Sequence, residues 1–185
     1  MQLTEELIKS WVKEASDRKA YPSPLFPPSL YYRFFRVMAE HLKPNLTVVL
    51  GVCGGGDCLH FALGNPQGQV VGVDLEYDHP EQLQHVKYTC SNFSFWHGDS
   101  LKSAASIFSH YGTVDILFID TTHTKEQTWA ELNAWGPYMS DNYIICFDDL
   151  KRKEMGNIWD ELPEPKLRLD ELHPIAEGGF GIIWK

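Results

Sequence analysis

Acidic residues directly follow two of the most apolar segments of the sequence. Asp120 ends the segment ILFID, and Asp148 and Asp149 end the segment IICFDD. Carboxylates are unfavourable in strands and repel one another at close range, so three of them at neighbouring strand ends require a cation or protons. Such hard oxygen ligands favour Mg²⁺, Ca²⁺ or Mn²⁺, and we expect Mg²⁺. The alternative is that some of these acids cap helices or face solvent.

A histidine lies close to this acidic group in the sequence. His123 follows Asp120 by three residues, which places it in the loop after the strand. Its unperturbed pKa of about 6.5 suits an imidazole to general-base catalysis near neutral pH. A single histidine is often only a surface or packing residue, but its closeness to the carboxylates makes His123 a candidate base.

The segment LGVCGGGDCLHFA, residues 50–62, places three consecutive glycines between two cysteines. The four cysteines, at positions 53, 58, 90 and 146, lack the spacing of a zinc site, so we expect buried, reduced thiols. Glycines permit positive φ and let a ligand approach the main chain, and a following helix offers free N–H groups. The segment therefore predicts a ligand-binding loop, with a tight turn that binds nothing as the alternative.

Two further strand ends carry groups that suit a nucleoside. Asp74 ends QVVGVD, at the distance from the glycine loop where an acid binds ribose hydroxyls in nucleotide-binding βαβ units. The dinucleotide spacing G-x-G-x-x-G and a Walker sequence are both absent, which favours S-adenosylmethionine (SAM) over NAD. Asp99 and Ser100 could contact an adenine edge, although Asp99 could equally cap the helix beginning near Leu101.

The elements that must position these residues alternate along the chain. Apolar or β-branched runs predict five strands, and helical patterns lie between them. The strand segments are 46–52, 69–75, 93–99, 114–120 and 143–149, and the helical ones are 58–64, 80–90, 101–111 and 124–139. The tail 166–185 predicts two more strands as an antiparallel pair. We therefore expect an α/β, Rossmann-like, doubly wound and mostly parallel sheet of seven strands, with helices on both faces.

The 185 residues predict a single domain in three parts. Residues 1–44 form a helical segment, interrupted by the prolines of 21–29, that could cover the site as a lid or could simply pack on the sheet. Residues 45–150 form the binding core, and 151–185 supply the C-terminal strands. The net charge of −9 argues against nucleic-acid or membrane partners, and the absence of a span or signal sequence predicts a cytoplasmic protein.

At this point the sequence resembles the class I SAM-dependent methyltransferases, over about residues 45–150. More narrowly, it is similar to the metal-dependent O-methyltransferase group of the CmcI-type (cephalosporin hydroxylase-like) proteins and the macrolide sugar O-methyltransferases. The resemblance is carried by LGVCGGGDCLHFAL, VVGVDL, GDS and, most specifically, LFIDTTHTKEQTWAELNAWGPYMSDNYIICFDDL. One position departs from the pattern, because Val49 stands where these enzymes commonly carry an acid.

The resemblance implies a role for each candidate residue. Cofactor binding would involve Gly51, Val52, Gly55, Gly56, Asp74, Asp99 and Ser100. The divalent-metal ligands would be Asp120, Asp148 and Asp149, and catalysis would use His123 together with Asp120. We expect O-methylation of a small-molecule hydroxyl, in a chain that could form a homo-oligomer. The alternatives are a non-catalytic protein that keeps the fold to bind a cofactor or partner, and a nucleotide-dependent oxidoreductase.

Overall fold

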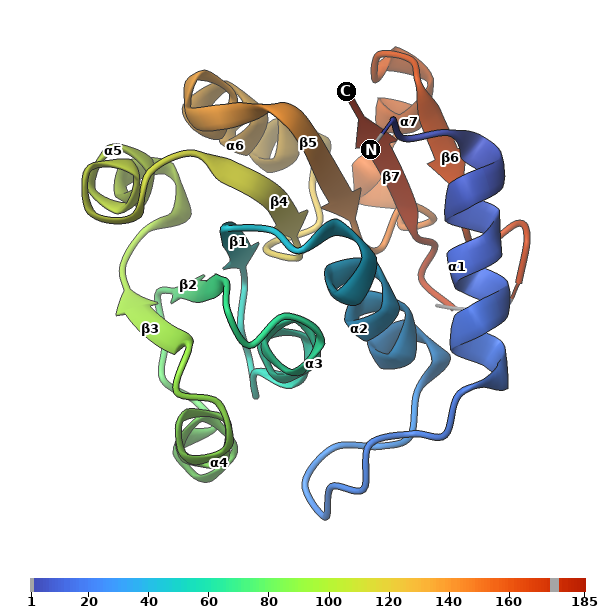
Figure 1. The fold of residues 1–185 in the computed structure, drawn as a ribbon. Helices are drawn as coiled ribbons and strands as arrows, with labels where there is room; N and C mark the ends of the chain where they lie inside the picture. Colours follow the sequence, from blue (N-terminus) through green and yellow to red (C-terminus); the bar gives the residue numbers. More distant parts are fainter. Residues whose placement is uncertain (1, 174–176) are drawn as a thin grey trace.

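A computed structural model describes residues 2–173 and 177–185 and contains one seven-stranded sheet (Figure 1). Its strand order is β3-β2-β1-β4-β5-β7-β6, in which β1 to β5 are parallel and β7 runs antiparallel to both β5 and β6. The strands are β1 (Leu46–Leu50), β2 (Gln69–Asp74), β3 (Phe93–His97), β4 (Val114–Ile119), β5 (Met139–Phe147), β6 (Lys166–Arg168) and β7 (Gly181–Trp184). The predicted fold class is confirmed.

Helices cover both faces of the sheet (Figure 1). They are α1 (Glu5–Asp17), α2 (Leu30–Leu42), α3 (Gly56–Gly64), α4 (Pro80–Thr89), α5 (Ser100–Tyr111), α6 (Lys125–Trp135) and α7 (Ile158–Glu161), with 3₁₀ turns at Gly136–Tyr138 and Lys153–Met155. Alternate residues of the central strands pack on opposite sides: Val49 joins the core under α1 to α4, whereas Val48 and Leu50 join the core under α5 to α7. Both faces of these strands are therefore buried, which explains their unbroken apolar sequence.

The fifth strand begins earlier than the sequence indicates. We expected a helix to Met139 and a strand from Tyr143, but α6 ends at Trp135 and β5 starts at Met139. Gly136 and Pro137 turn the chain through a 3₁₀ helix, and the strand then pairs with β4 across a register shift. Polar residues 140–142 thus belong to an irregular strand start rather than to a turn.

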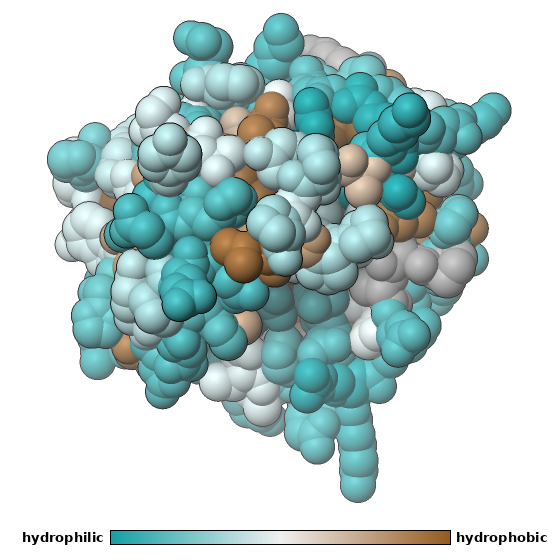
Figure 2. Space-filling view, turned by 90° about the horizontal axis from the view of Figure 1, so that it is seen from below, coloured by the Kyte–Doolittle hydropathy of each residue, from teal (hydrophilic) through white to brown (hydrophobic). Residues whose placement is uncertain are grey.

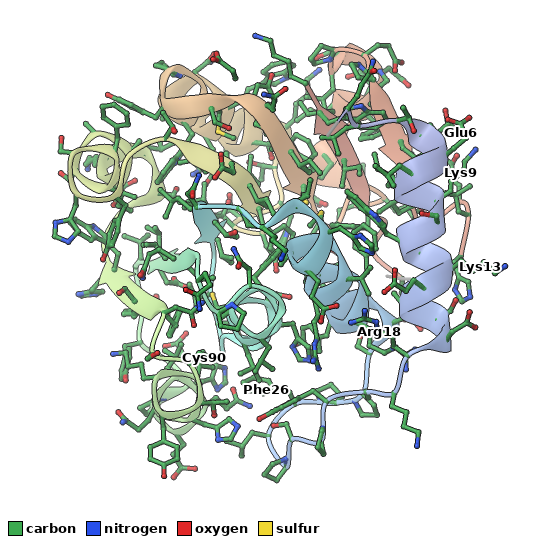
Figure 3. All side chains as sticks on the ribbon, viewed as in Figure 1. Glu6, Lys9, Lys13, Arg18, Phe26 and Cys90 are labelled. Atoms are coloured by element: carbon green, nitrogen blue, oxygen red, sulfur yellow. The ribbon has the colours of Figure 1, made fainter. Side chains whose placement is uncertain are left out.

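The N-terminal helices pack on the sheet. In α1, Ile8, Trp11 and Ala15 recur at helical spacing and are fully buried, while Glu6 and Lys9 lie on the outer side (Figure 3). The proline-rich segment between α1 and α2 is held by Phe26, whose ring lies near those of Tyr32 and His85. The lid role of residues 1–44 stays a prediction.

Figure 2 shows one face of the molecule, coloured by the hydropathy of its residues. Hydrophilic residues cover most of the face seen in Figure 2, with hydrophobic ones scattered between them. Among the helices of the described residues, none is both long and apolar enough to cross a bilayer.

Phe35 occupies the centre of the core between α2 and the sheet, stacked on Phe61 at 4.5 Å between ring centroids. We expect Phe35→Ala to lower the free energy of unfolding by about 3–5 kcal/mol, because it leaves a cavity in a closely packed region. Phe108→Ala is the matched control, since the Phe108 ring is 39% exposed, and it should cost much less. Urea denaturation of both variants measures the difference; equal losses would contradict this description of the core.

Candidate active site

A cavity of about 700 Å³ opens at the carboxyl ends of the parallel strands. Its lining comes from the loops that follow β1, β2, β3, β4 and β5, which is where ligands bind in open α/β sheets. Of the residues singled out from the sequence, those that line it are Gly51, Asp74, Asp99, Ser100, Asp120, His123 and Asp149. Val52, Gly55, Gly56 and Asp148 are not among the lining residues.

The glycine loop is held by backbone packing and by one carboxylate. Gly51 has φ +82°, and a Cβ there would overlap the carbonyl oxygen of Asp120. Asp74 Oδ2 accepts hydrogen bonds from the backbone N–H groups of Val52 (2.7 Å) and Cys53 (3.1 Å). Asp74 therefore fixes the loop as well as facing the cavity.

The other glycines serve helix packing. Gly55, with φ +81°, is the N-cap of α3, and a Cβ on Gly56 would overlap the ring of Tyr32. Close approach of α2 and α4 to this turn thus accounts for both positions. The cofactor roles of Val52, Gly55 and Gly56 stay predictions.

Asp99 caps the N-terminus of α5, which was the alternative to contact with an adenine edge. Its carboxylate accepts a hydrogen bond from the Leu101 N–H at 2.8 Å and forms an ion pair with Lys102. Ser100 lines the cavity, and its hydroxyl donates to Glu131 Oε1 at 2.7 Å. Glu131 is fully buried and was not identified from the sequence. The feature of the sequence that could have indicated its burial is the helical spacing of Glu131 from Thr128 and Trp135, which are both buried on α6.

His123 and Asp149 form a pair that lines the cavity. Both residues have left-handed φ values, +52° and +54°. His123 Nδ1 lies 3.3 Å from Asp149 Oδ2 and 3.8 Å from Asp120 Oδ1. Arg152, which the sequence analysis did not single out, contacts Asp149 Oδ2 through its Nε and also lines the cavity. The basic run 151–153 was its only sequence signal.

Partial burial lowers the pKa of His123 below its ordinary value of 6.5. The carboxylate of Asp149 opposes this shift, and the charge of Arg152 adds to it. The imidazole is therefore neutral at pH 7 and able to accept a proton.

Three carboxyl groups lie close enough to influence one another: Asp120, which lines the cavity, and Asp148 and Asp57, which do not. Burial, with the charges of Asp148 and Asp57, raises the pKa of Asp120 well above its usual range. Burial also raises the pKa of Asp148 to about 6, and burial with the charge of Asp148 raises that of Asp57 to about 7. Oδ1 of Asp148 and Oδ1 of Asp57 have no hydrogen-bond partner. Asp57, directly after the three glycines, also escaped the sequence analysis.

The three predicted metal ligands, Asp120, Asp148 and Asp149, are not arranged around a common metal position in this structure. Asp149 is engaged by Arg152 and His123, so it does not join Asp120 and Asp148 around a common point. Within residues 2–173 and 177–185, no group of three or more His, Cys, Asp or Glu side chains is arranged to hold a metal ion. The donor set therefore does not fit a cation in this arrangement, and the metal site stays a prediction.

Residues 33–150 match the family described as a methyltransferase domain. This stretch runs from α2 to the residue after Asp149 and includes every strand end that lines the cavity. The chain belongs to this methyltransferase family. The narrower resemblance to CmcI-type proteins stays a prediction. No curated protein matches the sequence.

Solved structures of several O-methyltransferases have the same fold as this methyltransferase domain. A putative caffeoyl-CoA O-methyltransferase from Staphylococcus aureus is 11% identical with a TM-score of 0.68, covering 100% of this chain and 93% of that one. An O-methyltransferase from Bacillus cereus in complex with S-adenosylhomocysteine (SAH) is 12% identical with a TM-score of 0.65, covering 98% of this chain and 91% of that one. The O-methyltransferase TomG from Streptomyces achromogenes in complex with SAM is 9% identical with a TM-score of 0.62, covering 98% of this chain and 89% of that one.

Gly51 provides a direct test of how the loop of this methyltransferase domain is held. We expect Gly51→Ala to cost about 2–4 kcal/mol of unfolding free energy, because the Cβ meets the Asp120 carbonyl and φ is positive. Gly136→Ala is the control, since a Cβ there has open space and φ is −48°. Thermal and urea unfolding measure both variants, and a Gly51→Ala protein as stable as Gly136→Ala would contradict the description.

Proposed function

We propose that this methyltransferase domain transfers a methyl group from SAM to a hydroxyl of a small-molecule acceptor, with His123 as the general base. The observation that carries the proposal is the His123–Asp149 pair, which faces the same cavity as the glycine loop and Asp74. A base, a loop suited to a nucleoside and a cavity of ligand size thus meet at one edge of the sheet.

Two features support SAM as the cofactor. The cavity has the size of a typical small-ligand site, and it runs from Gly51 past Asp74 to Ser100, so it offers glycine backbone, a carboxylate and a hydroxyl-bearing wall. Two proteins of the same fold are described in complex with SAH or SAM. These residues suit an adenosyl ligand with a short charged tail.

The acceptor class follows from the base and its surroundings. A neutral imidazole can accept the proton of a hydroxyl group while the hydroxyl oxygen forms a new bond. Structural neighbours described as O-methyltransferases support oxygen as the accepting atom. We therefore propose a hydroxyl-bearing small molecule, bound on the His123 side of the cavity.

In the proposed reaction, the proton of neutral His123 is on Nδ1, which lies 3.3 Å from Asp149 Oδ2, and the Nε2 lone pair is free for the acceptor. Bound SAM supplies an electrophilic methyl carbon on its sulfonium sulfur. The methyl group would pass from the sulfonium sulfur to the acceptor oxygen and leave S-adenosylhomocysteine, while Nε2 of His123 takes the hydroxyl proton. Asp149 stabilises the resulting imidazolium, and Arg152 holds the Asp149 carboxylate in place.

His123→Gln tests the base. We expect turnover of hydroxyl acceptors to fall by about 10²–10⁴-fold, because the proton loses its acceptor, while SAH affinity changes little. His110→Gln is the control, since His110 is exposed on α5 and away from the cavity. Transfer of a labelled methyl group from SAM measures turnover across an acceptor panel, and calorimetry measures SAH binding. Full turnover by His123→Gln would overturn the role of His123.

The same measurements separate the proposal from a non-catalytic protein. Binding of SAH without methyl transfer to any acceptor, together with indifference to His123→Gln, supports the non-catalytic alternative. Failure of the wild-type protein to bind SAM and SAH would overturn the cofactor proposal itself.

Metal dependence stays a prediction, and the proposed reaction uses no metal step. For a cation to use Asp120, Asp148 and Asp149 together, Asp149 must leave Arg152 and His123. The prediction expects EDTA to lower turnover, Mg²⁺ to restore it, and Asp149→Asn to reduce the Mg²⁺-stimulated part with SAH binding intact. Glu126→Asn, an exposed acid on α6, is the control. Turnover that is equal in EDTA and in Mg²⁺ would contradict the prediction.

A further inference from the structure

One wall of the cavity is tied to a single buried carboxylate. Ser100 at the start of α5, Thr121 in the loop after β4, and Gln127 on α6 all line the cavity. Each donates a hydrogen bond to Glu131: Ser100 Oγ to Oε1 at 2.7 Å, Gln127 Nε2 to Oε1 at 2.9 Å, and Thr121 Oγ1 to Oε2 at 3.1 Å. Glu131 itself is fully buried and does not line the cavity.

The network is anchored from behind. Trp135 Nε1 donates to the backbone carbonyl of Ser100 at 2.9 Å, which ties α6 to the first turn of α5. Gln127 Nε2 also lies 3.3 Å from Ser100 Oγ, so the amide nitrogen faces the network and not the cavity. The three lining residues therefore have little freedom to turn their polar groups.

An ionised carboxylate only accepts hydrogen bonds, so its partners must all present donors to it. Burial raises the pKa of Glu131, and the three donated hydrogen bonds oppose that shift. Ser100 and Thr121 thus use their hydroxyl donors on Glu131, and Gln127 uses its two N–H donors on Glu131 and on Ser100 Oγ. The groups left for a ligand are acceptors: one lone pair of the Ser100 hydroxyl, the lone pairs of the Thr121 hydroxyl and the amide oxygen of Gln127.

We propose that Glu131 is a positioning residue that makes this wall an array of acceptors, and that the wall selects a purine with a 6-amino group over one with a 6-oxo group. An amino group donates to such a wall, whereas a carbonyl oxygen meets only acceptors. This inference rests on the proposed function, which brings an adenosyl ligand to the cavity. In this inference, Glu131 does not contact the ligand but orients the three side chains that line the cavity.

The test compares SAH with S-inosylhomocysteine, in which the 6-amino group is replaced by a 6-oxo group, by calorimetry. We expect the wild-type protein to prefer SAH by about tenfold or more, because a misplaced carbonyl leaves the wall unpaired. Glu131→Gln brings a donor into the network and makes at least one of the three side chains turn. The preference should then fall about fivefold or more. Glu126→Gln, an exposed acid on the same helix, should keep the wild-type preference.

Each outcome bears on the inference. An unchanged preference in folded Glu131→Gln, an equal loss of affinity for both ligands, or a wild-type protein without preference overturns it. If Glu131→Gln does not fold, Gln127→Met decides, since it removes the amide oxygen from the cavity wall and should lower the preference; an unchanged preference overturns the inference. A wild-type protein that binds neither ligand overturns the proposed function, and this inference with it.

Discussion

The site depends on backbone hydrogen bonds that continue the parallel ladders one residue beyond the strands. Gly51 N–H donates to the Val73 carbonyl, Asp120 N–H to the Leu50 carbonyl, and Asp148 N–H to the Ile119 carbonyl. These bonds carry the register of β1, β2, β4 and β5 into the loops. Residues that lie far apart in the sequence are therefore brought to one edge with little freedom in their backbones, and the side chains that line the cavity start from a rigid frame.

The same frame forces an electrostatic problem. Parallel strands that each end in an acid bring carboxylates together in a partly buried place, where water cannot compensate their repulsion. The fold answers it in three ways: Arg152 and His123 face Asp149, donors surround Glu131, and burial keeps protons on Asp57 and Asp148 to higher pH than usual. Each acid is thus stabilised by different neighbours. Asp149 pairs with Arg152 and His123, whereas the sequence predicted that it would bind a cation together with Asp120 and Asp148.

Much of the fold could be predicted from the sequence because its signals are local. Continuous apolar runs marked the five parallel strands, and the tail showed the antiparallel pair that β6 and β7 form. The start of β5 could not be predicted, because polar residues 140–142 lack a strand pattern and enter the sheet only through pairing with β4. The sequence could not show which aromatic residues of α2 are buried, and only the tertiary structure shows that Phe34 and Phe35 are fully buried; the lid role of residues 1–44 stays a prediction.

For the site, the sequence by itself determined which polar residues stand at strand ends, because a parallel sheet gathers those ends at one edge. It placed Gly51, Asp74, Asp120, His123 and Asp149 there, and all of them line the cavity. Only the tertiary structure decided which group each side chain meets. Glu131 of α6 meets Ser100 of α5, and Asp57 of α3 lies close enough to Asp148, at the end of β5, for that charge to raise the pKa of Asp57. Hydrogen bonds and ion pairs depend on distances between elements, and spacing along the chain does not encode those distances.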